Sequence, residues 1–173
     1  MKSLFGTDGI RGEAGQFPLD PATVSAIGFS LASHLAERTA TPQIVIGRDT
    51  RESGESIERA LIAGANQAGA KCMSAGVITT PGVAFLTRKL QASAGVVISA
   101  SHNPYQDNGI KIFAPSGQKM DDSVERQIEA DIFENKQIAA AQPKSTPRSP
   151  EIEDQLHEDY LSFLAEEIGQ GLE

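Results

Sequence analysis

Residues 95–113 read GVVISASHNPYQDNGIKIF, in which two short apolar runs flank a polar loop. The runs GVVIS and GIKIF predict buried strands, because short stretches rich in β-branched residues between turn signals are typical of them. The segments N-P at 103–104 and D-N-G at 107–109 predict turns. The loop is long enough for the second strand to return antiparallel to the first, and it places polar side chains where the first strand ends.

Helices and strands alternate along the rest of the chain. The helices are predicted at residues 20–37, 54–69, 80–90, 121–135 and 151–169, and the strands at 43–47, 72–78, 95–99 and 109–113. Asp20 followed by Pro21 is a typical helix start, and Asp122 with Glu125 resembles a capping box. Short apolar strands that alternate with amphipathic helices favour an α/β layer fold with a largely parallel sheet.

The composition after residue 137 indicates a change in organisation. Residues 138–150 hold three prolines without an apolar periodicity, which predicts a linker between residues 1–137 and an acidic helix within residues 151–173. An isolated helix cannot bury its apolar stripe alone. The helix is therefore expected either to fold back on the domain or to lead toward a second domain outside this sequence.

Charge and cysteine content limit the possible functions. The net charge is −8, and residues 114–173 hold fourteen acidic against five basic side chains. The absence of a basic run argues against nucleic acid, and the absence of a long apolar run argues against a membrane span or a signal peptide. A single cysteine, Cys72, excludes an internal disulfide and indicates a reducing compartment, most simply the cytoplasm. Cys72 is expected to be a small buried residue, and His34 and His157 are expected at the surface.

Ser101 and its neighbour His102 taken alone are typical of a polar hairpin loop without chemistry, and three kinds of chemistry compete with that interpretation. Ser101 follows the predicted strand closely, and ligands of open α/β sheets bind beyond such strand ends. A serine hydrolase is disfavoured because the G-x-S-x-G elbow is missing, and a metal site because the three histidines show no ligand spacing. The third possibility is phosphoryl transfer through a phosphorylated serine, which needs an exposed hydroxyl, nearby cations and a proton carrier.

Two further motifs carry arginines between turn residues. Residues 5–12, FGTDGIRG, place Arg11 among glycines, which allow a close approach to a ligand, and a guanidinium matches phosphate oxygens. Residues 47–51, GRDTR, directly follow a predicted strand. Their charges fit either an anion site or a salt-bridged loop, and we favour the salt-bridged loop.

The three motifs together resemble the first domain of the α-D-phosphohexomutases. The order typical of that superfamily is found here: FGTDGIRG, then GRDTR, then SASHNPYQDNGIKIF. The residues of these motifs are most similar to those of the bacterial phosphoglucosamine mutases. The resemblance covers residues 1 to about 135. It implies a three-layer α/β/α domain with a mostly parallel sheet, working on a phosphosugar together with further domains of the same enzyme.

The resemblance also implies roles for particular residues. Ser101 corresponds to the phosphoserine, which would bind one Mg²⁺ through its phosphate. Lys111 corresponds to the lysine that handles the proton of the sugar hydroxyl, and Arg11 to an arginine that contacts the transferring phosphate. His102 would orient the substrate oxygen, and Asn103 and Asn108 would bind the phosphosugar or hold the loop in shape.

The implied reaction interconverts glucosamine 6-phosphate and glucosamine 1-phosphate, with glucosamine 1,6-bisphosphate as intermediate and activator. The sequence lacks the carboxylate-rich D-G-D-G-D-R loop that supplies the other magnesium ligands in this superfamily. The isolated chain is therefore expected to be nearly inactive. Two alternatives stay open: the same reaction on mannose or glucose phosphates, and a phosphosugar-binding module without catalysis.

Overall fold

The computed structural model describes residues 4–134 and 150–169. The strands are β1 (Ile10–Glu13), β2 (Gln43–Arg48), β3 (Lys71–Val77), β4 (Ala94–Ile98) and β5 (Asp107–Phe113). The helices are α1 (Pro21–Ala36), α2 (Gly54–Gln67), α3 (Thr80–Lys89), α4 (Asp122–Glu134) and α6 (Asp154–Gly169). Every predicted helix and strand is confirmed, and β1 is an additional strand that the sequence analysis missed.

The five strands form one mixed sheet in the order β1-β5-β4-β2-β3. β2 runs parallel to β3 and β4, whereas β5 runs antiparallel to both β4 and β1. The predicted α/β fold and the antiparallel return of β5 are confirmed, but the sheet is mixed where a mostly parallel one was expected. The reason is that β5 follows β4 through a loop without a crossover helix, and only such crossovers bring consecutive strands into parallel register.

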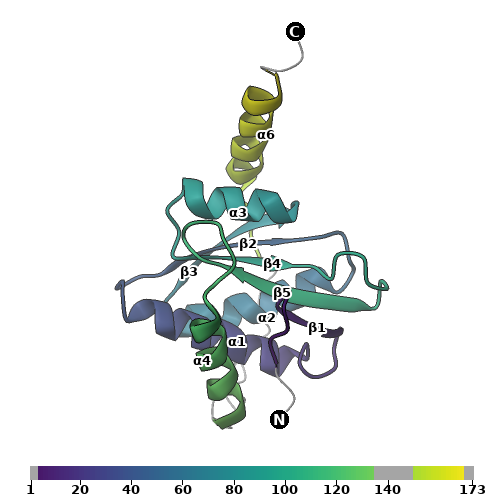
Figure 1. The fold of residues 1–173 in the computed structure, drawn as a ribbon, viewed down its shortest axis with the longest axis vertical. Coiled ribbons are helices and arrows are strands. Elements are labelled where there is room, and N and C mark those ends of the chain that lie inside the picture. Colours follow the sequence, from purple (N-terminus) through teal and green to yellow (C-terminus); the bar gives the residue numbers. More distant parts are fainter. Residues whose placement is uncertain (1–3, 135–149, 170–173) are drawn as a thin grey trace.

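The helices cover both faces of this sheet, as predicted for a three-layer α/β/α domain. Figure 1 shows α3 on one face and α1, α2 and α4 on the other, with α6 standing beyond α3. The larger apolar cluster lies between the sheet and α1, α2 and α4, and includes the fully buried Ile27, Ile46 and Ile98. The carboxyl ends of β2 and β4 meet on one side of the sheet, because the two strands are parallel neighbours.

Two glycines bring α1 and α2 into close contact. A Cβ atom on Gly64 would overlap the carbonyl oxygen of Ser25, and one on Gly28 would overlap that of Leu61. The two helix backbones therefore touch directly, without a layer of side chains between them. This contact places α2, and with it the loop that precedes α2, against the sheet.

The start of α4 differs from the predicted capping box. The cap is Asp121, whose Oδ1 accepts the N–H of Ser123 at 2.7 Å. Asp122 and Glu125 instead receive the amine of Lys119, at 2.8 and 3.0 Å. Burial raises the pKa of Glu125, and the neighbouring Lys119 opposes this shift. The other oxygen of Glu125, Oε1, is buried without a hydrogen-bond partner among the described residues, so Glu125 does not cap the helix start.

The acidic helix α6 folds back onto the domain and packs against α3. Leu156 is buried beside Val45 and Met73, and the ring of Phe163 stacks on that of Phe85 with 4.2 Å between centroids. The linker predicted at residues 138–150 lies outside the described residues except for Pro150. No helix within residues 4–134 and 150–169 is long and apolar enough to cross a membrane.

The prediction that His34 and His157 lie at the surface is only partly right. The His34 side chain is 20% exposed, and its Nε2 lies 3.1 Å from Asp131 on α4. His157 Nε2 lies 2.7 Å from the carbonyl oxygen of Ala75 in β3. Both imidazoles thus join helices to neighbouring elements, which a pattern of apolar residues along one helix does not reveal.

Candidate active site

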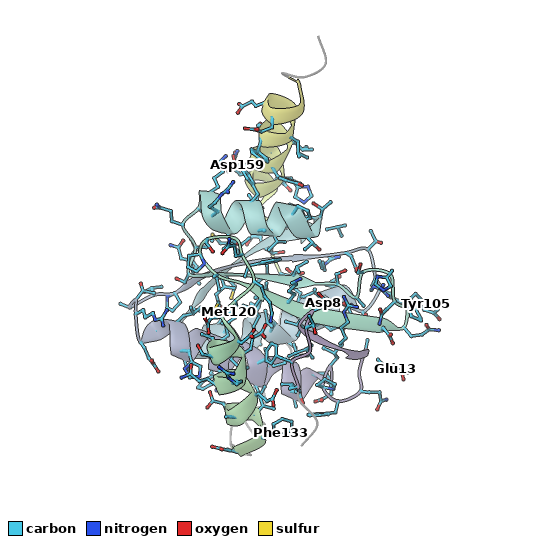
Figure 2. The ribbon with its side chains drawn as sticks, in the orientation of Figure 1. Asp8, Glu13, Tyr105, Met120, Phe133 and Asp159 are labelled. Carbon is cyan, nitrogen blue, oxygen red and sulfur yellow. The ribbon has the colours of Figure 1, made fainter. Side chains whose placement is uncertain are left out.

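Ser101 lies in the loop of residues 99–106 that joins β4 to β5, which we call the serine loop. The side chain is exposed, and the backbone has a φ of 55°, in the left-handed region. That conformation is unusual for a residue with a Cβ atom and costs on the order of 1 kcal/mol. The surrounding structure must therefore hold Ser101 in place. Figure 2 shows Tyr105 at the outer tip of this loop.

Two side chains, Ser99 at the start of the serine loop and Asp49 beside it, fix the backbone of Ser101. The hydroxyl of Ser99 donates to Asp49 Oδ2 at 2.7 Å, and its oxygen accepts the N–H of Ser101 at 3.0 Å. Asp49 belongs to the segment after β2, and its own N–H donates to the carbonyl of Ile98 at 3.0 Å. The ends of the parallel strands β2 and β4 are thereby joined directly below the serine.

Arg51 binds the serine loop more extensively than any single side chain of the loop itself. Its Nε donates to Asp49 Oδ2 at 3.0 Å, and its side chain is only 10% exposed. The two terminal nitrogens donate to four main-chain carbonyls on the opposite side, those of Ser101, Asn103, Pro104 and Asp107. The guanidinium is thus enclosed by the loop instead of facing solvent.

The favoured interpretation of GRDTR as a salt-bridged loop is confirmed. Arg51 pairs with Asp49, and Arg48 Nε pairs with Glu58 Oε2 at 3.0 Å. Glu58 is fully buried, and this burial raises the pKa of its carboxyl even though Ser74 and Arg48 both donate to it. Both ion pairs hold the segment between β2 and α2 in a fixed position against the serine loop.

Asn103 joins the serine loop to β1. Its Nδ2 donates to Asp107 Oδ2 at 3.0 Å, and its Oδ1 accepts from Arg11 Nη1 at 3.3 Å. Its N–H donates to the carbonyl of Ala100 at 3.1 Å. These bonds close the turn that the N-P segment predicts and place Asn103 beside Arg11.

Asn108 is fully buried and is the second residue of β5. Its Nδ2 donates to Ser53 Oγ at 2.9 Å, and its Oδ1 accepts the N–H of Gly109 at 2.8 Å. This position favours the loop-holding role that was one of its two expected roles. Direct contact of Asn108 with a phosphosugar stays a prediction that the packing does not favour.

Arg11 and Lys111 lie on neighbouring strands and share one carboxylate. In the β1–β5 pairing Arg11 stands opposite Gly109, where a side chain would come within 3.2 Å of Arg11 Cγ. Asp8 Oδ2 lies 3.8 Å from Arg11 Nη2, and Asp8 Oδ1 lies 3.7 Å from Lys111 Nζ. The two cations are therefore held together at the edge of the sheet.

The guanidinium of Arg11 has one unused hydrogen-bond donor among the described residues. Its Nε is buried without a hydrogen-bond partner among the described residues. The Arg11 and Lys111 side chains are about equally exposed, at 31% and 30%. His102, next to Ser101, is exposed. The serine loop thus exposes a hydroxyl and an imidazole and contacts Arg11 through Asn103, while Lys111 is linked to Arg11 through Asp8. Such cations attract an anionic ligand.

The comparisons with known proteins agree with this arrangement. A family model described as phosphoglucomutase/phosphomannomutase, alpha/beta/alpha domain I, matches residues 2–139. The chain belongs to this family. The α-D-phosphohexomutase resemblance drawn from the three motifs is confirmed, and so is the α/β/α domain that it implied.

Individual members of the family match this chain at about 50% sequence identity. A phosphoglucosamine mutase of Koribacter versatilis (strain Ellin345) is 50% identical over 171 residues, covering 97% of this chain and 37% of that protein. One of Neisseria gonorrhoeae (strain ATCC 700825 / FA 1090) is 52% identical over 135 residues, covering 77% and 30%. The chain thus spans about a third of the length of these curated relatives.

Solved structures of the family share the fold. A protein of Thermus thermophilus described as a phosphomannomutase superposes with a TM-score of 0.68 at 30% identity, covering 86% of this chain and 31% of that one. A phosphoglucomutase/phosphomannomutase family protein of Burkholderia thailandensis gives a TM-score of 0.66 at 24% identity, covering 90% and 34%. The second likeness supports the fold alone.

The described part of this phosphohexomutase domain offers few metal ligands. Within residues 4–134 and 150–169, no group of three or more histidine, cysteine or acidic side chains is placed to hold a metal ion. Asp49, the carboxylate nearest Ser101 along the hydrogen-bond chain, already accepts from Ser99 and Arg51. Binding of Mg²⁺ through a phosphorylated Ser101 stays a prediction.

Sequence reasoning missed three residues that shape the site: Asp49, Ser99 and Arg51. The signal was present in part, because GRDTR was recognised as a charged loop after a strand. What the sequence does not show is that β2 and β4 are adjacent, which brings this loop under the serine loop.

Proposed function

We propose that this chain is the phosphoserine-bearing domain of a phosphoglucosamine mutase, which interconverts glucosamine 6-phosphate and glucosamine 1-phosphate. The observation that carries the proposal is the exposed Ser101, held in a left-handed conformation on a loop whose Asn103 bonds to Arg11. Asp8 in turn lies between Arg11 and Lys111. The curated relatives at about 50% identity bear the name phosphoglucosamine mutase, which supports this substrate.

The reaction requires that the serine accept and return a phosphoryl group. The bond from Ser101 Oγ to phosphorus breaks as a sugar hydroxyl oxygen forms its bond to the same phosphorus, and the hydroxyl proton passes to the amine of Lys111. The glucosamine 1,6-bisphosphate then turns around. Ser101 Oγ bonds to its other phosphorus as the bond from that phosphorus to the sugar oxygen breaks, and the proton returns from Lys111 to that oxygen. Arg11 balances negative charge on the transferring group, as cations do in phosphoryl transfer.

The other expected components of the site have supporting roles. Mg²⁺, when bound to the phosphorylated serine, neutralises charge on the phosphate oxygens. His102 directly follows Ser101 and is exposed, so it can orient the sugar oxygen. Asn103 holds Arg11 in place. Further domains of the same enzyme would supply the rest of the metal site and the sugar-binding surface. The single cysteine supports a reducing compartment, the cytoplasm, for this activity.

A second candidate is the same reaction on mannose phosphates. The observation in its favour is the shared fold with the Thermus protein described as a phosphomannomutase, at 30% identity. The higher identity to the phosphoglucosamine mutases makes glucosamine phosphate the better-supported substrate.

A chimeric enzyme tests the proposed function. This chain replaces the matching first part of the Koribacter versatilis relative, to which it aligns over 97% of its own length. The assay supplies glucosamine 6-phosphate, Mg²⁺ and a trace of glucosamine 1,6-bisphosphate. We expect turnover in the chimera, none in its Ser101→Ala variant, and close to none in the isolated chain. The sugar-binding surface of the chimera comes from the relative, so the chimera tests the phosphoserine role of this chain. A folded chimera without turnover would contradict the proposed function.

A further inference from the structure

Arg51 has its hydrogen-bonding capacity fully used within the protein. A guanidinium carries five N–H donors in a fixed planar fork. The structure supplies five acceptors in matching positions: the carboxylate of Asp49 and the four main-chain carbonyls of Ser101, Asn103, Pro104 and Asp107. A bound phosphate would have to displace one of these. The arrangement therefore fits a clamp on the loop better than an anion ligand.

The bonds around Asp49 also set the direction of the Ser99 hydroxyl. A carboxylate only accepts, and a hydroxyl has a single proton. Because the Ser99 proton goes to Asp49 Oδ2 at 2.7 Å, the lone pairs of Ser99 Oγ are left to accept the Ser101 N–H at 3.0 Å. Arg51 shares the same carboxylate oxygen of Asp49, so all three contacts are linked.

These contacts fix the loop from both sides. Arg51 holds the carbonyl of Ser101 at 2.9 Å, while Ser99 holds its N–H. The peptide groups on either side of the Ser101 Cα are thus both restrained. Such a restraint is what a residue with a φ of 55° requires, because the left-handed region is otherwise sparsely populated.

We propose that Arg51 is a positioning residue for phosphoryl transfer, which holds the serine loop so that Ser101 Oγ faces the incoming phosphosugar. Asp49 and Ser99 transmit the same restraint to the Ser101 N–H. This inference rests on the proposed function, since it assigns Arg51 to the same site. It gives Arg51 no contact with substrate, and it predicts that Arg51 acts on the rate of the chemical step.

The chain itself provides the first test, through amide hydrogen exchange. In the Arg51→Lys variant the amine has at most three donors, so the loop loses part of its restraint. The backbone N–H groups of Asn103 and Asp107 both donate to carbonyls of the serine loop. We expect these two amides to exchange about tenfold faster than in the parent chain. Arg38→Lys is the matched control, because Arg38 is exposed and lies near Gln91 and Ser93, at the opposite end of β4.

The chimera described above provides the kinetic test. Misplacement of a reacting group by about 1 Å costs on the order of 100-fold in rate. We expect Arg51→Lys to lower kcat by about 100-fold while KM stays within about threefold, and Arg38→Lys to change neither. A rise in KM alone would make Arg51 a substrate ligand and overturn the inference. Unchanged kcat together with unchanged loop exchange would overturn it as well.

Two further readouts keep the inference separate from simple misfolding and from the proposed function. Ser99→Ala removes the acceptor for the Ser101 N–H, and we expect it to speed exchange of that amide and to lower kcat about tenfold. An unchanged Ser101 amide would contradict the proposed linkage. If the parent chimera were inactive, the proposed function would fail, while exchange in the chain alone would still decide whether Arg51 orders the loop.

Discussion

Lys111 Nζ lies 3.7 Å from Asp8 Oδ1, a contact between β5 and the glycine-rich turn that precedes β1. The same carboxylate lies 3.8 Å from Arg11 Nη2. Asp8 is 60% exposed, so neither pair contributes much to the free energy of folding. Their effect is geometric, since Asp8 keeps the two cations beside each other on the strands β1 and β5.

Replacing Lys111 should affect the chemical step more than substrate binding. In the chimera, Lys111→Ala is expected to lower kcat by about 100-fold, because general acid–base groups contribute about that much or more. The matched control is Lys71→Ala, an exposed lysine at the start of the β3 edge strand, which should leave kcat unchanged. An increase in KM without loss of kcat would assign Lys111 to binding and not to proton transfer.

The left-handed conformation of Ser101 predicts an unusual order of stabilities. Glycine adopts a φ of 55° without the Cβ clash, whereas alanine does not. Ser101→Gly is therefore expected to exceed Ser101→Ala by about 1 kcal/mol in the free energy of unfolding, measured by urea denaturation of the chain. Both variants lose the hydroxyl, so that contribution cancels. Equal stabilities would mean that the residue does not hold this conformation in solution.

The contact between α1 and α2 predicts a strong effect of one methyl group. Gly64→Ala would force its Cβ into the carbonyl oxygen of Ser25, and overpacking of this kind costs roughly 2–3 kcal/mol. Asn66→Ala, at an exposed position of the same helix, should change the free energy of unfolding by less than about 0.5 kcal/mol. A Gly64→Ala variant as stable as the parent would show that the helices are farther apart than described.

Cys72 should be a poor nucleophile in the folded chain. Its side chain packs against the larger apolar cluster, and burial raises the pKa of its thiol to about 12, from a reference value of 9.0. The folded state thus favours the protonated thiol, and at pH 8 it holds about a thousandfold less thiolate than the unfolded chain. Alkylation at pH 8 should accordingly be slow until denaturant is added. By the same linkage, stability should fall as the pH rises above 9. Equally fast alkylation of the folded and unfolded chains would contradict this burial.

Much of this fold follows from local patterns. The apolar runs and helix starts predict every strand and helix of the described residues except β1, because each of the others carries its own periodicity. β1 reads IRGE, which lacks an apolar run, and it becomes a strand by pairing with β5. The antiparallel return of β5 was predicted, but the second antiparallel pair was missed, because it is formed by β1 with β5.

In the candidate site, too, the residue types could be predicted from the sequence, whereas contacts between distant segments could not. The types of Ser101, Lys111 and Arg11 in their motifs predict phosphoryl-transfer chemistry. The fold links the two cations through Asp8 and joins Arg11 to the serine loop through Asn103. The hydrogen bonds from Arg51 to four main-chain carbonyls could not be predicted, because main-chain carbonyls carry no signature in the sequence. The burial of Asn108 was hidden for a related reason, as it depends on Ser53 from a distant segment.

The most direct test of the central claim is the phosphorylation of Ser101 in the chimera. The enzyme is first freed of phosphate, then incubated with glucosamine 1,6-bisphosphate and Mg²⁺, and the peptide that contains Ser101 is analysed by mass spectrometry. We predict the added mass of one phosphoryl group on Ser101, and its loss when glucosamine 6-phosphate is supplied as acceptor. An active chimera whose Ser101 stays unmodified throughout turnover would contradict the account.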